Sequence, residues 1–135
     1  IMKKTNKKAK IIIIKNNQLL MLKKKNTCFK FSLTGGNIKK NETKKEGLIR
    51  EVKEELSISI NKSDLKYITG YTLHSLNSND EHYYYYLKKE IENFTNGEPN
   101  KFEMINWIDL DDAVLFLNKF ERIILKDVLR AKLNI

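Results

Sequence analysis

The sequence predicts a single α/β domain in which a mixed β-sheet is sandwiched between α-helices. Strand-like segments lie on both sides of an early helix, and two further helices follow near the end of the chain. A length of 135 residues suits one domain with a real core, and the chain contains no repeats and no linker. We therefore expect residues 1–135 to form one domain, with residues 1–8 as a flexible, basic N-terminus.

The segments before the early helix have the pattern of β-strands. Residues 11–14 and 19–23 are apolar runs separated by four polar residues, a pattern typical of a β-hairpin. Residues 29–33 then lead into Gly35 and Gly36. Two adjacent glycines allow a tight turn there, which would bring a backbone carbonyl close to the start of the helix.

The early helix is predicted to begin at Thr43 and to end near Ser57. Thr43 and Glu46 have the spacing of a capping box, in which each side chain satisfies a backbone donor of the first turn. Four apolar residues form one stripe along this helix: Leu48, Ile49, Val52 and Leu56. Three acidic residues form a second stripe beside it: Glu51, Glu54 and Glu55.

The second half of the chain predicts three strands and two helices. Residues 65–73 and 82–87 are rich in aromatic and β-branched residues and are predicted as strands joined by a polar turn at residues 77–80. Residues 104–108 form a short strand. Asp109 and Asp112 cap a short helix through Leu117, and residues 120–133 form a final amphipathic helix.

The acidic stripe has two interpretations. Like charges three or four residues apart on a helix repel each other, so a bare stripe is unfavourable. A divalent cation such as Mg²⁺ would relieve the repulsion, because Mg²⁺ binds oxygen ligands and is usually held by carboxylates together with substrate phosphates. A solvated charged face in a charge-rich chain is the alternative, but this alternative does not explain the two glycines just before the helix.

Residues 36–58, GNIKKNETKKEGLIREVKEELSI, resemble the Nudix box, GX5EX7REUXEEXGU, in which U is a bulky aliphatic residue. Every fixed position matches except Ser57, where the family has glycine. Thr34 also stands where many members have proline before the glycine pair. We expect both departures to alter stability more than chemistry, and a non-glycine residue at Ser57 to strain the exit of the helix. The resemblance implies the α/β/α Nudix fold, and it places the chain near MutT-like nucleoside triphosphate pyrophosphohydrolases.

The resemblance also implies a set of metal ligands and catalytic residues. Mg²⁺ or Mn²⁺ would be held by the Gly35 carbonyl and by carboxylates of the helix: Glu51, Glu54 and Glu55. The segment from Asn96 to Trp107 is similar to a MutT-like pattern, N-x-E-P-x-K-x-E-x-x-x-W, which adds Glu98 or Glu103 as a further ligand. The catalytic residues implied are Glu51 as general base, Arg50 as its orienting partner and Glu54. Glu42 and Gly36 would have structural roles in the motif.

Four residues are candidates for binding a nucleotide. Lys23 would meet the terminal phosphate, and Gly36 would let the substrate approach the backbone. The run of four tyrosines from residue 83 alternates between the faces of a strand, so an outward ring, taken here as Tyr84, would stack on a base. His82 would contact the nucleotide. For both aromatic residues, an ordinary structural role in the sheet remains the alternative.

Composition limits the other classes of function. The net charge of +9 attracts polyphosphates of any kind, but Lys and Asn are spread over all segments, which indicates a compositional bias rather than a nucleic-acid surface. No apolar run approaches a membrane span, and no signal-peptide pattern is present. Cys28 is the only cysteine, consistent with a reducing compartment, and we expect it in or near the core. We therefore expect a cytoplasmic monomer or homodimer that binds a nucleotide and neither a membrane nor a nucleic acid.

Three functions remain open after these arguments. The leading hypothesis is a Mg²⁺-dependent hydrolase that converts a nucleoside triphosphate to the monophosphate and pyrophosphate. The second is a pyrophosphatase acting on ADP-ribose or another nucleoside diphosphate derivative. The third, from a different class, is a Nudix-like module that binds nucleotides or RNA without cleaving them.

Overall fold

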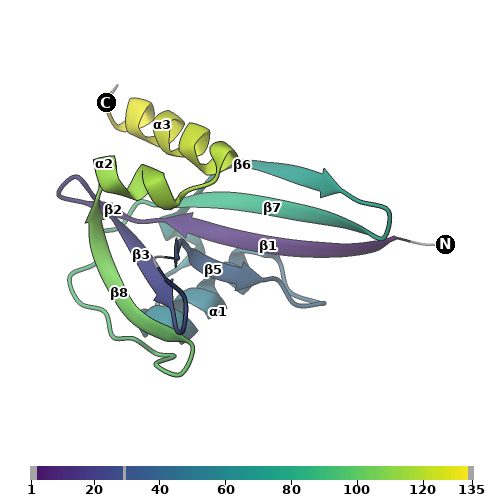
Figure 1. Cartoon of the computed structure of the whole chain (residues 1–135), viewed down its shortest axis with the longest axis horizontal. Coiled ribbons are helices and arrows are strands. Elements are labelled where there is room, and N and C mark those ends of the chain that lie inside the picture. Colours follow the sequence, from purple (N-terminus) through teal and green to yellow (C-terminus); the bar gives the residue numbers. More distant parts are fainter. Residues whose placement is uncertain (1–2, 29, 134–135) are drawn as a thin grey trace.

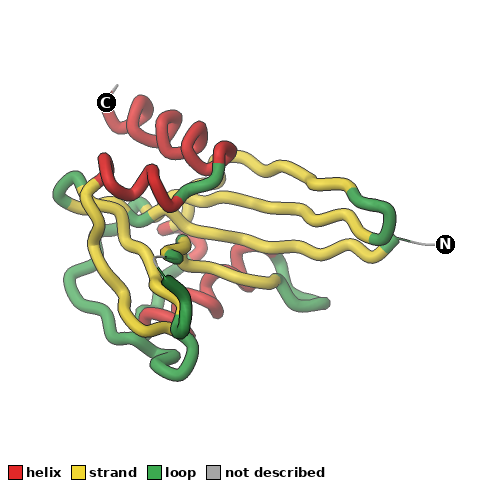
Figure 2. Tube along the Cα trace, in the orientation of Figure 1, coloured by secondary structure: helices red, strands yellow, loops and turns green. Residues whose placement is uncertain are grey.

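A computed structural model describes residues 3–28 and 30–133, which fold into two β-sheets and three α-helices (Figures 1 and 2). The first sheet has the strand order β5-β1-β7-β6. The strands are β1 (Lys4–Ile12), β5 (Thr34–Asn37), β6 (Leu65–His74) and β7 (Ser78–Leu87). This sheet is mixed, because β1 and β7 run parallel while the β1–β5 and β6–β7 pairs are antiparallel.

The second sheet is antiparallel and is built around β3. Its strands are β2 (Ile14–Lys15), β3 (Gln18–Lys24), β4 (Phe31–Ser32) and β8 (Phe102–Asp109), and β3 pairs with each of the others. Asn16 and Asn17 form the turn between β2 and β3 with φ values of 51° and 62°. Two left-handed residues match the twist of a tight hairpin, and asparagine tolerates that conformation.

The helices cover opposite faces of the mixed sheet. α1 (Lys44–Leu56) lies on one face, whereas α2 (Leu110–Ala113) and α3 (Lys119–Leu133) lie on the other (Figure 1). Short 3₁₀ turns at Lys62–Asp64 and Val114–Phe116 complete the described elements. The predicted α/β fold, with a mixed sheet between helices, is therefore confirmed.

Each face of the sheet has its own hydrophobic core. The core under α1 is formed by buried residues that include Ala9, Ile11, Leu48, Val52, Leu56 and Tyr85. The core under α2 and α3 includes Ile12, Met21, Tyr84, Leu117, Ile124 and Val128. Successive strand residues point to opposite faces, so β1 and β7 supply neighbouring residues to different cores.

The N-terminal segment differs from the prediction. Residues 4–8 were expected to be flexible, but they form the first half of β1 and pair with β7, and Lys8 among them also pairs with β5. The polar side chains gave no apolar alternation, and the strand is held instead by backbone pairing with β7 along its length and with β5 from Lys8 onwards. Residues 1 and 2 lie outside the described residues.

Several predicted boundaries also need correction. The hairpin predicted from residues 11–14 and 19–23 is confirmed only next to its turn, where β2 pairs with β3. The preceding strand, β1, ends at Ile12 in the first sheet, and the chain then enters the second sheet. Of the predicted turn at residues 77–80, residues 78–80 belong to β7, where β1 provides a parallel partner. Gly35 and Gly36 lie within β5 rather than in a loop. Cys28 is exposed, so its expected place in or near the core is wrong, and Phe29 lies outside the described residues.

Candidate active site

The capping box and the apolar stripe fix both the start and the rotation of α1. The Glu46 N–H donates to Thr43 Oγ1 at 3.1 Å, and the Thr43 N–H donates to Glu46 Oε1 at 2.8 Å, which confirms the predicted capping box. Burial of Leu48, Val52 and Leu56 in the core turns the neighbouring acidic face of the helix towards the edge of the sheet.

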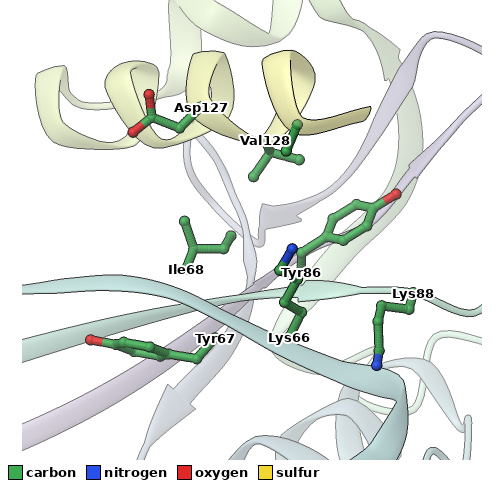
Figure 3. A pocket seen from close by; sticks show the side chains of 8 residues that line it. Lys66, Tyr67, Ile68, Tyr86, Lys88, Asp127 and Val128 are labelled. Atoms are coloured by element: carbon green, nitrogen blue, oxygen red, sulfur yellow. The ribbon is translucent and has the colours of Figure 1, made fainter. Parts of the chain in front are cut away.

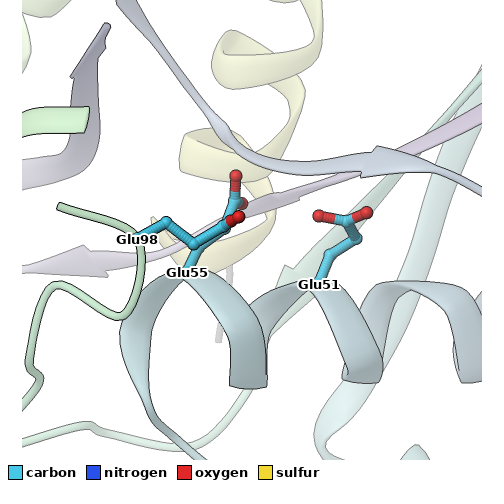
Figure 4. A group of neighbouring side chains, drawn as sticks. All are labelled: Glu51, Glu55 and Glu98. Carbon is cyan, nitrogen blue, oxygen red and sulfur yellow. The ribbon is translucent and has the colours of Figure 1, made fainter. Parts of the chain in front are cut away.

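Three carboxylates meet beside α1. Ligand oxygens of Glu51, Glu55 and Glu98 all lie within 4.8 Å of one another (Figure 4). Glu55 is only 2% exposed, and its Oε1 accepts a hydrogen bond of 2.9 Å from the Gly35 N–H. Burial raises the pKa of Glu55 from 4.5 to about 8; the Gly35 N–H opposes this rise and the Glu51 charge adds to it. In the metal-free protein Glu55 therefore keeps its proton near neutral pH, and a bound cation would favour its charged form.

Gly36 provides the space into which the Glu51 carboxylate extends. A Cβ atom at Gly36 would lie 2.7–2.9 Å from three carboxylate atoms of Glu51. Since real Cβ atoms do not approach other atoms so closely, any side chain at this position would displace that carboxylate. The second glycine of the pair thus has a steric role in the site.

The loop that carries Glu98 is fastened to the C-terminal end of α1 by its backbone. The Gly97 N–H donates to the Glu55 carbonyl and the Thr95 N–H donates to the Leu56 carbonyl, each at 3.0 Å. A Cβ atom at Gly97 would lie 2.0 Å from the Glu54 carbonyl oxygen, so this contact requires glycine. Sequence reasoning missed the role of Gly97, although its place between Asn96 and Glu98, at the first variable position of the MutT-like pattern, was the available signal.

The donor set of this group fits a hard divalent cation. Glu98 Oε1 is buried and has no hydrogen-bond partner among the described residues. A buried acceptor without a partner is costly, and a cation surrounded by carboxylate oxygens would satisfy it. Glu51, Glu55 and Glu98 are thus the residues that would hold Mg²⁺ or Mn²⁺, while the Gly35 carbonyl remains a predicted ligand.

Arg50 connects this group to the N-terminal part of the motif. Its Nη2 donates to Glu42 Oε1 at 2.7 Å and its Nε donates to Glu42 Oε2 at 3.1 Å, a bidentate pair. Its Nη1 donates to Glu51 Oε1 at 3.1 Å, and its Nη2 also donates to the Asn37 carbonyl at 2.9 Å. The bond from Arg50 is the main reason that the pKa of Glu42 is lowered. Glu42 steadies Arg50 and the preceding loop, and Arg50 orients Glu51.

Two of the predicted ligands lie outside the carboxylate group of the described residues. Glu54 has a side chain that is 44% exposed, and it accepts a bond of 3.3 Å from Arg50 Nη1. Glu103 on β8 forms an ion pair with Lys23 on β3, a residue predicted to bind phosphate. Of the two loop glutamates considered from sequence, Glu98 is the one that the fold places beside Glu51 and Glu55.

The two aromatic candidates for substrate binding behave differently. Tyr84 is 0% exposed, and its hydroxyl donates to Glu121 Oε2 at 2.8 Å. The expectation that Tyr84 faces outward to stack on a base is wrong, because α3 covers that face of the sheet. His82 is only partly buried; its ring stacks on Tyr71 with centroids 4.8 Å apart, and its Nδ1 is buried without a hydrogen-bond partner among the described residues.

An apolar pocket of about 320 Å³ lies away from these residues, between β6 and α3 (Figure 3). Its lining includes Tyr67, Ile68, Tyr86 and Val128. None of the residues predicted for the site lines this pocket, so it is not the candidate active site.

The whole chain was compared with known proteins. The family model described as the NUDIX domain matches residues 5–129. A MutT NUDIX hydrolase from Burkholderia pseudomallei is structurally similar with a TM-score of 0.75, 20% sequence identity and coverage of 92% of this chain and 98% of that one. A MutT protein from Methanosarcina mazei Go1 matches with a TM-score of 0.74, 16% identity and 98% coverage of both chains. At these identities the structural likeness supports the fold alone.

A shorter match comes from a curated relative, an ADP-ribose pyrophosphatase from Methanocaldococcus jannaschii. It is 45% identical over 49 residues, which cover 35% of this chain and 29% of that protein.

In the described part of the chain, no helix is both long enough and apolar enough to cross a bilayer.

The fold agrees with this family match, and the three residues of the carboxylate group lie within the matched residues. The extent of the family match settles the assignment: the chain belongs to the Nudix family.

Proposed function

We propose that this protein is a Mg²⁺-dependent hydrolase that cleaves the diphosphate linkage of a nucleoside triphosphate to give the monophosphate and pyrophosphate. The observation that carries the proposal is the convergence of ligand oxygens of Glu51, Glu55 and Glu98 within 4.8 Å, with one buried carboxylate oxygen that has no hydrogen-bond partner in the described part of the chain. Mg²⁺ bound there would neutralise phosphate charge and make a bound water more acidic.

The residues around this group have separate roles in the proposed reaction. Glu51 accepts the proton of the attacking water, whose oxygen forms a bond to one phosphorus as the bridging P–O bond breaks. Arg50 orients Glu51 through the 3.1 Å bond, and Glu42 holds Arg50 in turn. Burial of Glu55 keeps bulk water away from the charges and strengthens their effect on the substrate.

A second candidate substrate is ADP-ribose or a related nucleoside diphosphate derivative. The relative named as an ADP-ribose pyrophosphatase favours this substrate, because its sequence identity to this chain over the matched residues is higher than that of the MutT structures. A non-catalytic nucleotide-binding module is the alternative of another class. The intact acidic set argues against that alternative, because a module without a cation would bear the repulsion for no benefit.

A product analysis tests the proposal. The protein is incubated with Mg²⁺ and nucleoside triphosphates, ADP-ribose or dinucleoside polyphosphates, and the products are separated. Release of pyrophosphate from triphosphates supports the leading proposal, and cleavage of ADP-ribose alone supports the second. Tight nucleotide binding without turnover supports the binding module. Glu98→Gln should abolish turnover, whereas Glu103→Gln, the same change on the other candidate glutamate, should leave it nearly intact.

A further inference from the structure

A polar pocket of about 450 Å³ lies on the face of the mixed sheet that also carries α3. Of the candidate site residues described above, His82 is the one that lines this pocket. Five residues line it: Asn6, Lys8, Asn37, Asp80 and His82. Lys8 is in register with Asn37 of β5 and with His82 of β7, and Asn6 is in register with Asp80. Residues paired in this way share a face of the sheet, so three adjacent strands build the pocket wall.

The pocket adjoins the carboxylate group across the edge of the sheet. β5 is the edge strand, and its Asn37 lines the pocket while its backbone carbonyl accepts from Arg50 Nη2. The preceding residue, Gly36, faces the Glu51 carboxylate. Adjacent residues of β5 thus point to opposite faces of the sheet, so a substrate whose diphosphate lies at the acidic group would reach the pocket by passing around this edge strand.

The chemistry of the lining excludes two of the three parts of a nucleotide. A base is normally held by stacking on an apolar or aromatic surface, and the one aromatic ring in the lining, that of His82, is already stacked on Tyr71. A further phosphate needs uncompensated positive charge, but the carboxylate of Asp80 offsets the ammonium of Lys8. The sugar is the part that remains.

Hydroxyl groups match this lining because each one both donates and accepts a hydrogen bond. Asp80 Oδ1 accepts from Asn6 Nδ2 at 2.8 Å, and Oδ2 is the second acceptor of that carboxylate. Lys8 is a donor only, and the buried Nδ1 of His82 has no partner among the described residues. Burial and the charges of Lys10 and Lys8 lower the pKa of His82, so its ring is neutral near pH 7 and offers one donor and one acceptor.

We propose that this pocket binds the vicinal hydroxyls of a sugar in the substrate, with Asp80 and Lys8 as the residues that determine specificity. The inference rests on the proposed cleavage of a diphosphate linkage at the carboxylate group. Acidic side chains are common partners of ribose hydroxyls in nucleotide sites. The sugar is either the ribose of the nucleoside or a second sugar across the diphosphate, and both present the same pair of hydroxyls.

Two pairs of substrates distinguish these sources. Values of kcat/KM are measured with Mg²⁺ for ATP against 2′-deoxy-ATP, and for ADP-ribose against the methyl ester of ADP, which lacks the second sugar. In one of the two pairs, kcat/KM is expected to be roughly 10- to 100-fold higher for the substrate that carries the hydroxyls. This is the factor expected when a hydrogen bond to a charged group is lost. The pair that shows the preference identifies the sugar.

Matched variants show whether the pocket causes the preference. Asp80→Asn and Lys8→Met should reduce the ratio within that pair towards one. Glu81→Gln and Lys7→Met make the same changes one residue away, where Glu81 contacts Tyr83 and Lys7 lines a separate hollow beside α1; both should retain the ratio. Equal rates within both pairs, or a preference that survives both pocket variants, would overturn the inference.

Binding without turnover separates this inference from the proposed function. Calorimetry with Mg²⁺ compares the affinities for ADP and 2′-deoxy-ADP, and for ADP-ribose and the methyl ester of ADP, in the wild type and in Asp80→Asn. A preference that depends on Asp80, in a protein that hydrolyses nothing, supports the pocket and refutes the hydrolase. Hydrolysis with no preference within either pair has the opposite meaning.

Discussion

Replacing Glu55 with Gln should abolish a large pH dependence of stability in the metal-free protein. Burial raises the pKa of the folded-state carboxyl to about 8, against an ordinary value of 4.5 in an unfolded chain. The folded protein therefore keeps a proton that the unfolded chain releases, so the stability contributed at low pH is lost as the pH rises from 4.5 to about 8. At about 1.4 kcal/mol per pKa unit, this difference corresponds to roughly 5 kcal/mol.

Urea unfolding in the presence of EDTA measures this effect. Between pH 5 and 8.5 the wild type should lose several kcal/mol relative to Glu55→Gln, which has no charge to bury. Glu54→Gln is the matched control, because the Glu54 side chain is partly exposed to solvent, so loss of its charge should leave the pH dependence of the wild type unchanged. At pH 8, added Mg²⁺ should stabilise the wild type and have little effect on Glu55→Gln. Parallel stability curves for the wild type and Glu55→Gln would refute the reasoning.

Three further substitutions separate steric, conformational and polar effects. Gly36→Ala should lower the rate of Mg²⁺-dependent hydrolysis at least tenfold, because the new methyl group displaces the end of the Glu51 side chain. The unfolding free energy should change by less than about 1 kcal/mol, since only the end of that side chain moves. An unchanged rate would contradict the steric role of Gly36. Ser57→Gly should raise the unfolding free energy by about 1 kcal/mol, because Ser57 ends α1 in the left-handed region at φ 58°, and a loss of stability would argue against strain there. Thr34→Val should stabilise the fold by about 1–2 kcal/mol, because the buried Thr34 hydroxyl has no hydrogen-bond partner in the described part of the chain; destabilisation in thermal melts would show that this hydroxyl has a partner.

Local patterns predicted α1 well because its signals are local. The capping box lies within four residues, and the apolar stripe repeats every three or four residues. Ser57 ends the helix in the left-handed conformation that glycine usually adopts there, and the strain expected from a non-glycine residue stays a prediction. The late strands were also recognised, since aromatic and β-branched residues suit a half-buried sheet. These signals depend only on neighbours along the chain.

Pairing between distant segments was beyond the reach of such patterns. Residues 4–8 carry no apolar alternation, so nothing local marks them as a strand, and only backbone pairing with β7, joined at Lys8 by β5, makes them one. For Tyr84, the alternation of faces was correct, but it assumed a solvated face. Because helices cover both faces of the sheet, Tyr84 and Tyr85 are buried on opposite sides.

The acidic site combines both kinds of information. The box supplied Glu51 and Glu55, but the sequence could not choose between Glu98 and Glu103, since both lie within the same polar segment. The choice depends on two backbone hydrogen bonds that fix residues 95–97 against the end of α1, and on the absence of a side chain at Gly97. Those bonds place Glu98 next to two other carboxyl groups, so the packing of the rest of the fold must outweigh the repulsion that arises when these groups are ionised. A cation would turn the same arrangement from a cost into a source of stability, and for that reason the pH dependence of the metal-free protein is the most direct physical test of the site.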